Sequence, residues 1–159
     1  MGDHRGKVEV HRFHKDGTLD KIIDCDHNDL LNGFYLQVAE MLLFYPVPAI
    51  PVPLDGWQYP YANEIQFGLG NAETLPSDST LSVPLESMFT PIITYPAAAT
   101  VLFSTYITDA EGYNGLTIRE AGLWSYNGML MARILIGGDD GLEIDTDNYI
   151  YGIKWTLTG

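Results

Sequence analysis

Histidines and carboxylates are the side chains of this sequence that could do metal or acid–base chemistry. The four histidines, His4, His11, His14 and His27, all lie near the N-terminus. On a strand, whose side chains alternate between faces, His11 and His14 would point to opposite sides and could not share a metal ion without a bulge. We therefore expect solvated histidines in this region rather than a metal site.

A group of acidic residues in a glycine-rich stretch near the C-terminus is the second candidate. Its carboxylates are Asp139, Asp140, Glu143, Asp145 and Asp147. Calcium binds oxygen ligands, which alternating carboxylates could supply, but the ligand spacing of an EF-hand loop is absent. A solvated loop is therefore the main expectation and a calcium ion the weaker one. The sequence predicts no other cofactor.

Motifs of known enzymes are missing from the sequence. It contains neither a Gly-Lys-Ser or Gly-Lys-Thr phosphate loop nor a Gly-x-Ser-x-Gly nucleophile elbow. The run Gly68-Leu69-Gly70 is too short for a dinucleotide fingerprint, and no helical pattern follows it. Glu64, Glu111 and Glu120 have the side chain that glycoside hydrolysis needs, but nothing in the sequence places them around a cleft. We therefore expect a protein that is not an enzyme.

Composition and charge narrow the class of partner. The chain has 159 residues, 46% of them hydrophobic, and a net charge of −13. That apolar content is enough for a folded core. No Lys or Arg occurs between Ile22 and Ile118, so the chain lacks the cluster of cations that nucleic-acid binding requires. An acidic membrane surface would repel the chain, and no segment approaches the ~20 apolar residues of a membrane span. We expect neither a nucleic acid nor a membrane as partner.

Strand patterns dominate the chain and would position these side chains. The strands that hydrophobic alternation predicts cover residues 7–14, 18–24, 64–70, 99–108, 116–124, 129–136 and 149–157. Asp16-Gly17 and Asn127-Gly128 are strong turn signals, and each predicts a hairpin. The pattern predicts a mainly β fold, a single-domain antiparallel β-sandwich over residues 1–159.

Two other elements are expected between the first hairpin and the later strands. Leu31, Phe34 and Val38 begin an apolar stripe at helical spacing, which predicts one amphipathic helix at about residues 29–44. Prolines then favour an extended proline- and aromatic-rich arm over residues 46–62, because proline lacks the N–H donor. We expect this apolar arm to dock on a partner, with packing across its own domain as the alternative. The candidate partner contacts are Tyr45, Pro46, Pro48, Ile50, Pro51, Pro53, Trp57, Tyr59 and Tyr61.

The C-terminal half of the chain carries an ordered set of short motifs. A strand ending in a glycine pair, residues 65–70, is followed by a loop rich in Thr, Pro, Ser and Asp with a final apolar residue, residues 74–81. Residues 118–124 contain Glu-Ala-Gly-Leu-Trp, and residues 127–133 end in Leu-Met-Ala-Arg. A terminal strand, residues 151–157, closes the set. In this order the motifs resemble a group of small tailed-bacteriophage proteins that are encoded among tail and fibre genes.

This resemblance covers most of the chain, since the short N-terminal hairpin and the helix led by Asn28 also look like that group. Residues 46–62 depart from it. The resemblance implies a non-enzymatic structural protein of the virion, made in the host bacterial cytoplasm. It would assemble at the tail, baseplate, neck or fibre attachment, with other virion proteins as partners. We also expect a closed homo-oligomer.

Two alternatives to this assignment remain open from the sequence. One is a capsid decoration or head-fibre protein, which differs only in its place in the particle. The other is a receptor-binding module for host surface glycans, because aromatic rings can serve as sugar platforms. The aromatic candidates are Trp57, Tyr59, Tyr61, Tyr95, Tyr113 and Trp124.

A charged residue lies on an otherwise apolar face of the motif strand at residues 116–124. There Glu120 would share a strand face with Ile118 and Trp124. A glutamate in line with apolar neighbours needs a partner, and Arg133 on the return strand is the candidate for a structural ion pair. The alternative is that Glu120 faces solvent, because sequence alone does not fix which face is buried.

Overall fold

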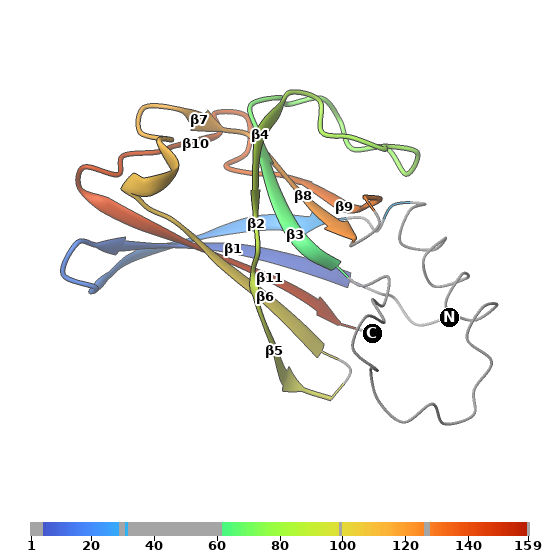
Figure 1. Cartoon of the computed structure of the whole chain (residues 1–159), viewed down its shortest axis with the longest axis horizontal. Helices are drawn as coiled ribbons and strands as arrows, with labels where there is room; N and C mark the ends of the chain where they lie inside the picture. The colour runs from blue at the N-terminus through green and yellow to red at the C-terminus, as the bar shows by residue number, and fades with distance from the viewer. Residues whose placement is uncertain (1–4, 29–30, 32–61, 99, 126–127, 159) are drawn as a thin grey trace.

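The computed structural model describes residues 5–28, 31, 62–98, 100–125 and 128–158. Over these residues the protein is mainly β, with antiparallel strands and one short 3₁₀ helix, η1 (Asp109–Glu111) (Figure 1). This confirms the predicted fold class. The strands are β1 (Arg5–His14), β2 (Leu19–Asn28), β3 (Ala62–Gly68), β4 (Pro84–Phe89), β5 (Ile92–Ala97), β6 (Thr100–Ile107), β7 (Thr117–Ile118), β8 (Glu120–Ser125), β9 (Leu130–Leu135), β10 (Leu142–Glu143) and β11 (Tyr149–Thr158).

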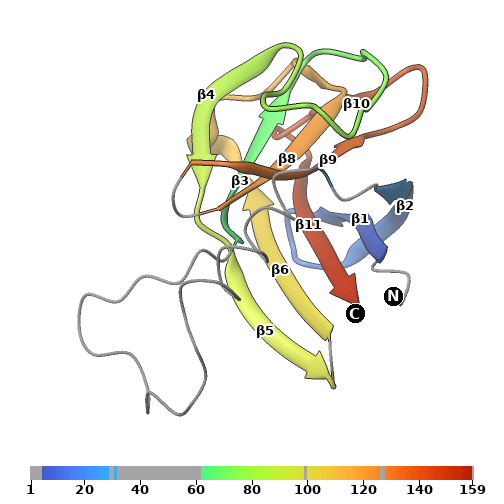
Figure 2. The same ribbon diagram turned by 90° about the vertical axis from the view of Figure 1, so that its right-hand side faces the viewer.

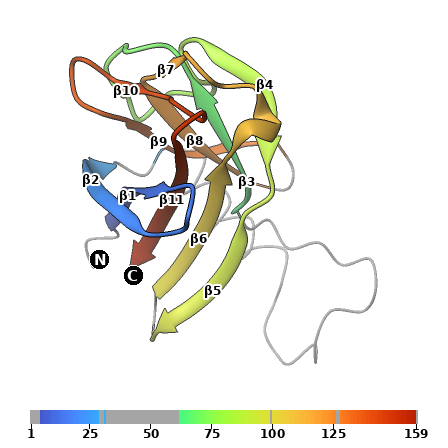
Figure 3. The same cartoon turned by 90° about the vertical axis from the view of Figure 1, so that its left-hand side faces the viewer.

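The strands form two main sheets in a sandwich-like arrangement. One sheet has five strands in the order β2-β1-β11-β6-β5, and the other has four in the order β4-β3-β8-β9. A two-stranded ladder pairs β10 with β7. Figures 2 and 3 show the two main sheets as separate layers, with the chain passing from β4 in one sheet directly to β5 in the other. The sheets are therefore linked along one side by a nearly continuous strand.

Side chains from both sheets meet in one hydrophobic core. Val10 and Trp155 of the five-stranded sheet and Ile65 and Phe67 of the four-stranded sheet are fully buried in the same cluster. In β1, apolar Val8 and Val10 alternate with exposed or half-buried neighbours, which is the period-two pattern of a strand with one buried face. The core thus lies between the two layers.

The structure adds three strands to the predicted set and divides one predicted strand. The additions are the two-residue β10 and the longer β4 and β5, which the sequence pattern did not predict because Pro84 and Pro96 interrupt these runs. Both β4 and β5 are edge strands of their sheets. Proline is tolerated in an edge strand because the N–H groups on its outer side have no neighbouring strand to bond. The strand predicted over residues 116–124 is instead divided at Arg119: β7 pairs with β10, whereas β8 pairs with β3 and β9.

The predicted helix at residues 29–44 and the predicted arm at residues 46–62 lie outside the described residues, apart from Leu31 and Ala62. All the candidate partner contacts between Tyr45 and Tyr61 lie outside them as well. No helix in the described part of the chain is long and apolar enough to span a membrane.

Candidate functional site

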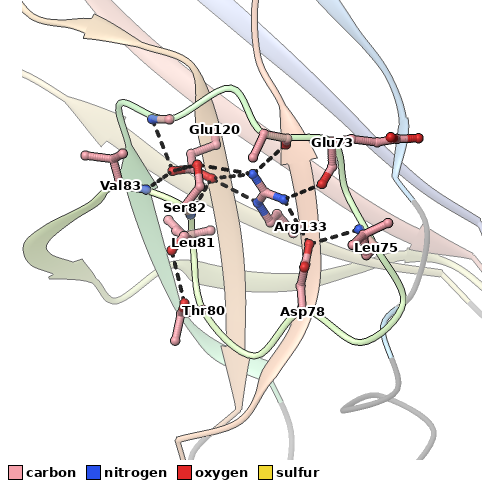
Figure 4. Close-up of polar contacts among 11 residues, drawn as sticks. Glu73, Leu75, Asp78, Thr80, Leu81, Ser82, Val83, Glu120 and Arg133 are labelled. Atoms are coloured by element: carbon pink, nitrogen blue, oxygen red, sulfur yellow. Dashed lines mark hydrogen bonds and ion pairs between the residues drawn. The ribbon is translucent and has the colours of Figure 1, made fainter.

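Glu120 and Arg133 form a buried ion pair on two neighbouring strands. Glu120 begins β8, and Arg133 lies in β9 opposite Gly122. Their side chains are 0% and 2% exposed. Arg133 Nε donates to Glu120 Oε2 at 2.9 Å, and Arg133 Nη2 lies 2.8 Å from the same oxygen (Figure 4). The structure therefore brings together the two residues that the sequence paired, and Glu120 does not face solvent.

The loop between β3 and β4, residues 69–83, supplies further donors to the Glu120 carboxylate. The backbone N–H groups of Val83, Ser82 and Gly70 donate to it at 2.8, 3.0 and 3.2 Å, and the Ser82 hydroxyl donates at 3.2 Å. A buried carboxylate is stable only when such donors replace water. Glu120 therefore fastens both ends of this loop to β8.

Arg133 fastens the middle of the same loop. Its Nη2 donates to the carbonyl of Ala72 at 2.8 Å, and its Nη1 donates to the carbonyl of Glu73 at 3.2 Å and to Asp78 Oδ2 at 2.8 Å. With the Nε bond to Glu120 and a bond from Nη2 to Ser82 Oγ at 3.5 Å, these contacts give all five N–H groups of the guanidinium a partner. Asp78 in turn accepts the N–H of Leu75 at 3.0 Å. The buried charges are thus compensated by each other and by the loop.

The electrostatics of Glu120 favour the ionised form of its carboxyl group. Burial alone raises the pKa of a carboxyl, but hydrogen bonds from the Val83 and Ser82 N–H groups and from Arg133 outweigh burial and lower the pKa of Glu120. A general acid needs the opposite shift and contact with a substrate. Since Glu120 is ionised and inaccessible, its role is structural.

The glycine pair of the motif provides the space that Glu120 occupies. A Cβ atom at Gly68 would lie 2.5 Å from Glu120 Oε1 and 2.8 Å from the carbonyl oxygen of Val83. A Cβ atom at Gly70 would overlap Ser82 Oγ and lie 2.8 Å from Glu120 Oε1. Because a larger residue at either position would displace the carboxylate, these glycines belong to the ion-pair network and not to a nucleotide-binding turn.

Gly122 makes room for a second, smaller apolar cluster beside the network. This cluster contains buried Leu31, Leu81 and Leu130, with Trp124 packed against it. A Cβ atom at Gly122 would lie 2.7 Å from Leu130 Cδ1 and 2.9 Å from Leu81 Cδ2. Leu81 lies near the end of the 69–83 loop. Because Gly122 has no side chain, this end of the loop can pack against β8 and β9. The Glu-Ala-Gly-Leu-Trp motif thus combines an ion-pair residue with packing residues.

The two histidines that the structure describes have separate partners. His11 Nε2 lies 3.0 Å from Glu9 Oε2, and His14 Nε2 lies 3.3 Å from Asp20 Oδ1. The side chains of His4 and His27 lie outside the described residues. In the part of the chain that is described, no group of three or more His, Cys, Asp or Glu side chains could hold a metal ion.

Two of the C-terminal acidic residues, Asp145 and Asp147, bind asparagine side chains. Asp145 accepts hydrogen bonds from the backbone and side-chain N–H groups of Asn148 at 3.3 and 2.9 Å. Asp147 accepts a bond from Asn114 Nδ2 at 3.3 Å. Residues 139–147 are all described, and no three of their carboxylates are grouped as a metal site, so the calcium site that was the weaker expectation is not formed among them.

Three of the remaining enzyme and glycan candidates, Glu111, Tyr113 and Trp124, have structural contacts of their own. Glu111 caps η1 by accepting the Thr108 N–H at 2.6 Å, so it has a structural role away from Glu120. Tyr113 is buried in the main core, and Trp124 is half-buried against leucines, which removes both as open sugar platforms. Tyr95 is the exposed member among the described aromatic candidates, at 76%.

Sequence reasoning found the Glu120–Arg133 pair but missed the loop that completes it. Asp78 entered the sequence argument only as part of a polar motif, and Ser82 lies just beyond that motif. The signal was Gly68 and Gly70 before that loop, because glycines at the end of a buried strand imply a close approach by another group. The donors themselves are mostly backbone N–H groups, which sequence does not distinguish.

The chain matches no family model, no curated protein and no solved structure. What it does must therefore be inferred from its own contacts and from the motif resemblance.

Proposed function

We propose that this chain is a non-enzymatic structural protein of a tailed-bacteriophage particle. It assembles with other virion proteins at the tail, baseplate, neck or fibre attachment. This assignment begins from the resemblance of its ordered motifs to small phage proteins encoded among tail and fibre genes.

The observation that supports the proposal is that these motifs, which are far apart in the sequence, lie together in the fold. The glycine pair at Gly68 and Gly70, the loop around Asp78, Glu120 and Arg133 all meet in one buried network. Every one of these residues either holds the 69–83 loop or makes room for it. A signature made of loop-fastening residues supports a scaffold that presents a surface to neighbours, because binding surfaces are commonly loops held by a rigid framework.

Quantitative mass spectrometry of purified particles tests the proposal. The chain is measured against the major capsid and tail proteins of the phage that encodes it. A few to tens of copies per particle would support a tail, neck or fibre position. Hundreds of copies would instead favour capsid decoration, the first alternative, or a repeating tail component. Absence from washed particles would sink the structural assignment.

A deletion variant tests the proposed anchoring segment independently. Residues 46–62 supply an apolar, proline-rich stretch that we propose docks on a neighbouring virion protein. Removing them should prevent incorporation of the chain into phage particles. The shortened chain should still give the far-ultraviolet circular dichroism spectrum of a β protein, which would show that it folds. Normal incorporation of the shortened chain would contradict the anchor but would leave the virion assignment standing.

A further inference from the structure

The five-stranded sheet has two outer strands of opposite character. β2 forms one end of the sheet and β5 the other. β2 carries Asp20, Lys21, Asp24 and Asp26, whereas β5 contains no charged residue. Charged side chains are the usual means by which a protein prevents another strand from adding to a sheet edge. The β2 edge is therefore protected in a way that the β5 edge is not.

The uncharged region extends well beyond β5. Between Glu86 and Asp109 the chain has no charged residue, although its net charge is −13. This stretch contains the whole hairpin of β5 and β6. An uncharged edge strand on so acidic a protein is a place where two like-charged chains can approach with little repulsion.

The side chains of β5 are strongly exposed although several are apolar. Ile92 is 65% and Tyr95 76% exposed, and Thr94 between them is also exposed. Figures 1 and 3 show β5 at the rim of the sheet, beside β6 and on the side away from β1 and β2. Within the described residues no strand lies against its outer side, so one row of backbone N–H and C=O groups faces outward. Such an edge is a template for strand addition.

We propose that β5 is a self-association edge, at which β5 of a second copy of this chain pairs antiparallel across a two-fold axis. A second copy is the expected partner because its β5 strand is uncharged too. A charged partner would need oppositely charged side chains to bind, and β5 has none. Pro96 has no N–H to donate, so the new ladder is short and we place the axis at Thr94, which then lies opposite Thr94 of the second copy. The inference does not depend on the assignment to a phage particle.

The test is the molar mass of the purified full-length chain, measured by light scattering and sedimentation over a range of concentrations. The wild type should reach twice the chain mass of 17.7 kDa. Thr94→Lys should raise the dissociation constant of this dimer at least about tenfold, because residues near a two-fold axis meet their own counterparts and like charges are then opposed. Ile22→Lys, at an exposed position of β2, is the matched control and should leave the dimer unchanged.

Several outcomes would overturn the proposal. They are a monomeric wild type at all concentrations, a dimer that survives Thr94→Lys, and a dimer that Ile22→Lys dissociates. Raising NaCl from about 0.05 to about 0.5 M should leave the dimer intact or strengthen it, because salt screens the repulsion between acidic copies. Dissociation by salt would point to ion pairs elsewhere and would count against β5.

A measurement on the wild type covers the case in which Thr94→Lys fails to fold. Amide hydrogen exchange in residues 92–95 should slow on going from dilute monomer to concentrated dimer, while exchange in β2 stays constant. An unchanged rate in β5 would refute the pairing. Because none of these measurements involves phage particles, their failure is distinct from failure of the virion assignment.

Discussion

At the scale of single residues, Glu120 and Arg133 depend on each other, so substituting one of them should lower the free energy of unfolding. Arg133→Met would leave the Glu120 carboxylate buried without its cation. Breaking a buried pair in this way costs about 3–5 kcal/mol. We expect that loss in the free energy of unfolding, measured by urea denaturation.

The control for this substitution is Arg119→Met, which removes an arginine whose Nη1 bonds the Asp139 carbonyl on the surface. An exposed contact of this kind contributes no more than about 1 kcal/mol. Equal losses in the two variants would contradict the role given to Arg133. The double variant Glu120→Gln with Arg133→Met should lose less than the sum of the single losses, because the two residues act as one unit.

Protonation of Glu120 provides a second test at the same scale. The pKa of Glu120 is lower in the folded protein than in the unfolded chain, so the unfolded chain takes up the proton first as pH falls. Ionised Glu120 therefore stabilises the fold fully at pH values above its pKa in the unfolded chain, which is about 4.3. This stabilisation is lost as the pH falls through the lower pKa of Glu120 in the folded protein. The difference in unfolding free energy between wild type and Glu120→Gln should be largest near neutral pH and shrink in acid. A difference that stays constant from neutral pH into acid would rule out this linkage.

At the scale of elements, the 69–83 loop should open without unfolding of the sheets. Asp78 links the loop to Arg133 and accepts the Leu75 N–H. Asp78→Asn keeps a similar shape but removes the charge, and a hydrogen bond to a charged group contributes about 1.5–3 kcal/mol. Amides of residues 72–79 should therefore exchange at least about tenfold faster, because 1.4 kcal/mol corresponds to that factor.

Exchange in β3 and β8 should stay unchanged in this variant, since neither strand depends on Asp78 for its ladder. Ser79→Ala is the control within the same loop, because Ser79 is exposed. If Asp78→Asn speeds exchange throughout the four-stranded sheet, the loop and the sheet are one cooperative unit and the local opening is wrong.

The strands also differ in how well the sequence predicts them. Strands with regular alternation, such as β1 with Val8 and Val10, follow from pattern alone because one face is buried. β4 and β5 escaped because prolines at Pro84 and Pro96 remove donors, and only the sheet order reveals that these donors are not needed at an edge. The division of the 116–124 strand at Arg119 depends on β10, a partner too short to have a sequence pattern.

The same limit applies to the buried network. Glu120 could be paired with Arg133 because a buried charge demands a partner on a neighbouring strand. The donors at Ser82 and Val83 could not be found in this way, because every residue type except proline offers a backbone N–H. Their position depends on the path of a loop, which tertiary packing sets.

At the scale of the whole molecule, the shared core predicts that the two main sheets unfold together. Ile153 lies in the five-stranded sheet and Ile65 in the four-stranded one, and both are buried in the same cluster. Ile153→Ala and Ile65→Ala should each cost about 2–5 kcal/mol. If the sheets form one cooperative unit, either variant lowers the temperature of a single calorimetric transition whose calorimetric and van't Hoff enthalpies agree.

Ile22→Ala on β2 is the control, since Ile22 is 50% exposed and truncating it opens no cavity in the core. Its effect should stay within about 0.5 kcal/mol. Two separate transitions, one moved by Ile153→Ala and the other by Ile65→Ala, would mean that the sheets fold independently. In that case the crossing from β4 to β5 would be a linker between two units, and strand pairing at β5 would involve only one of them.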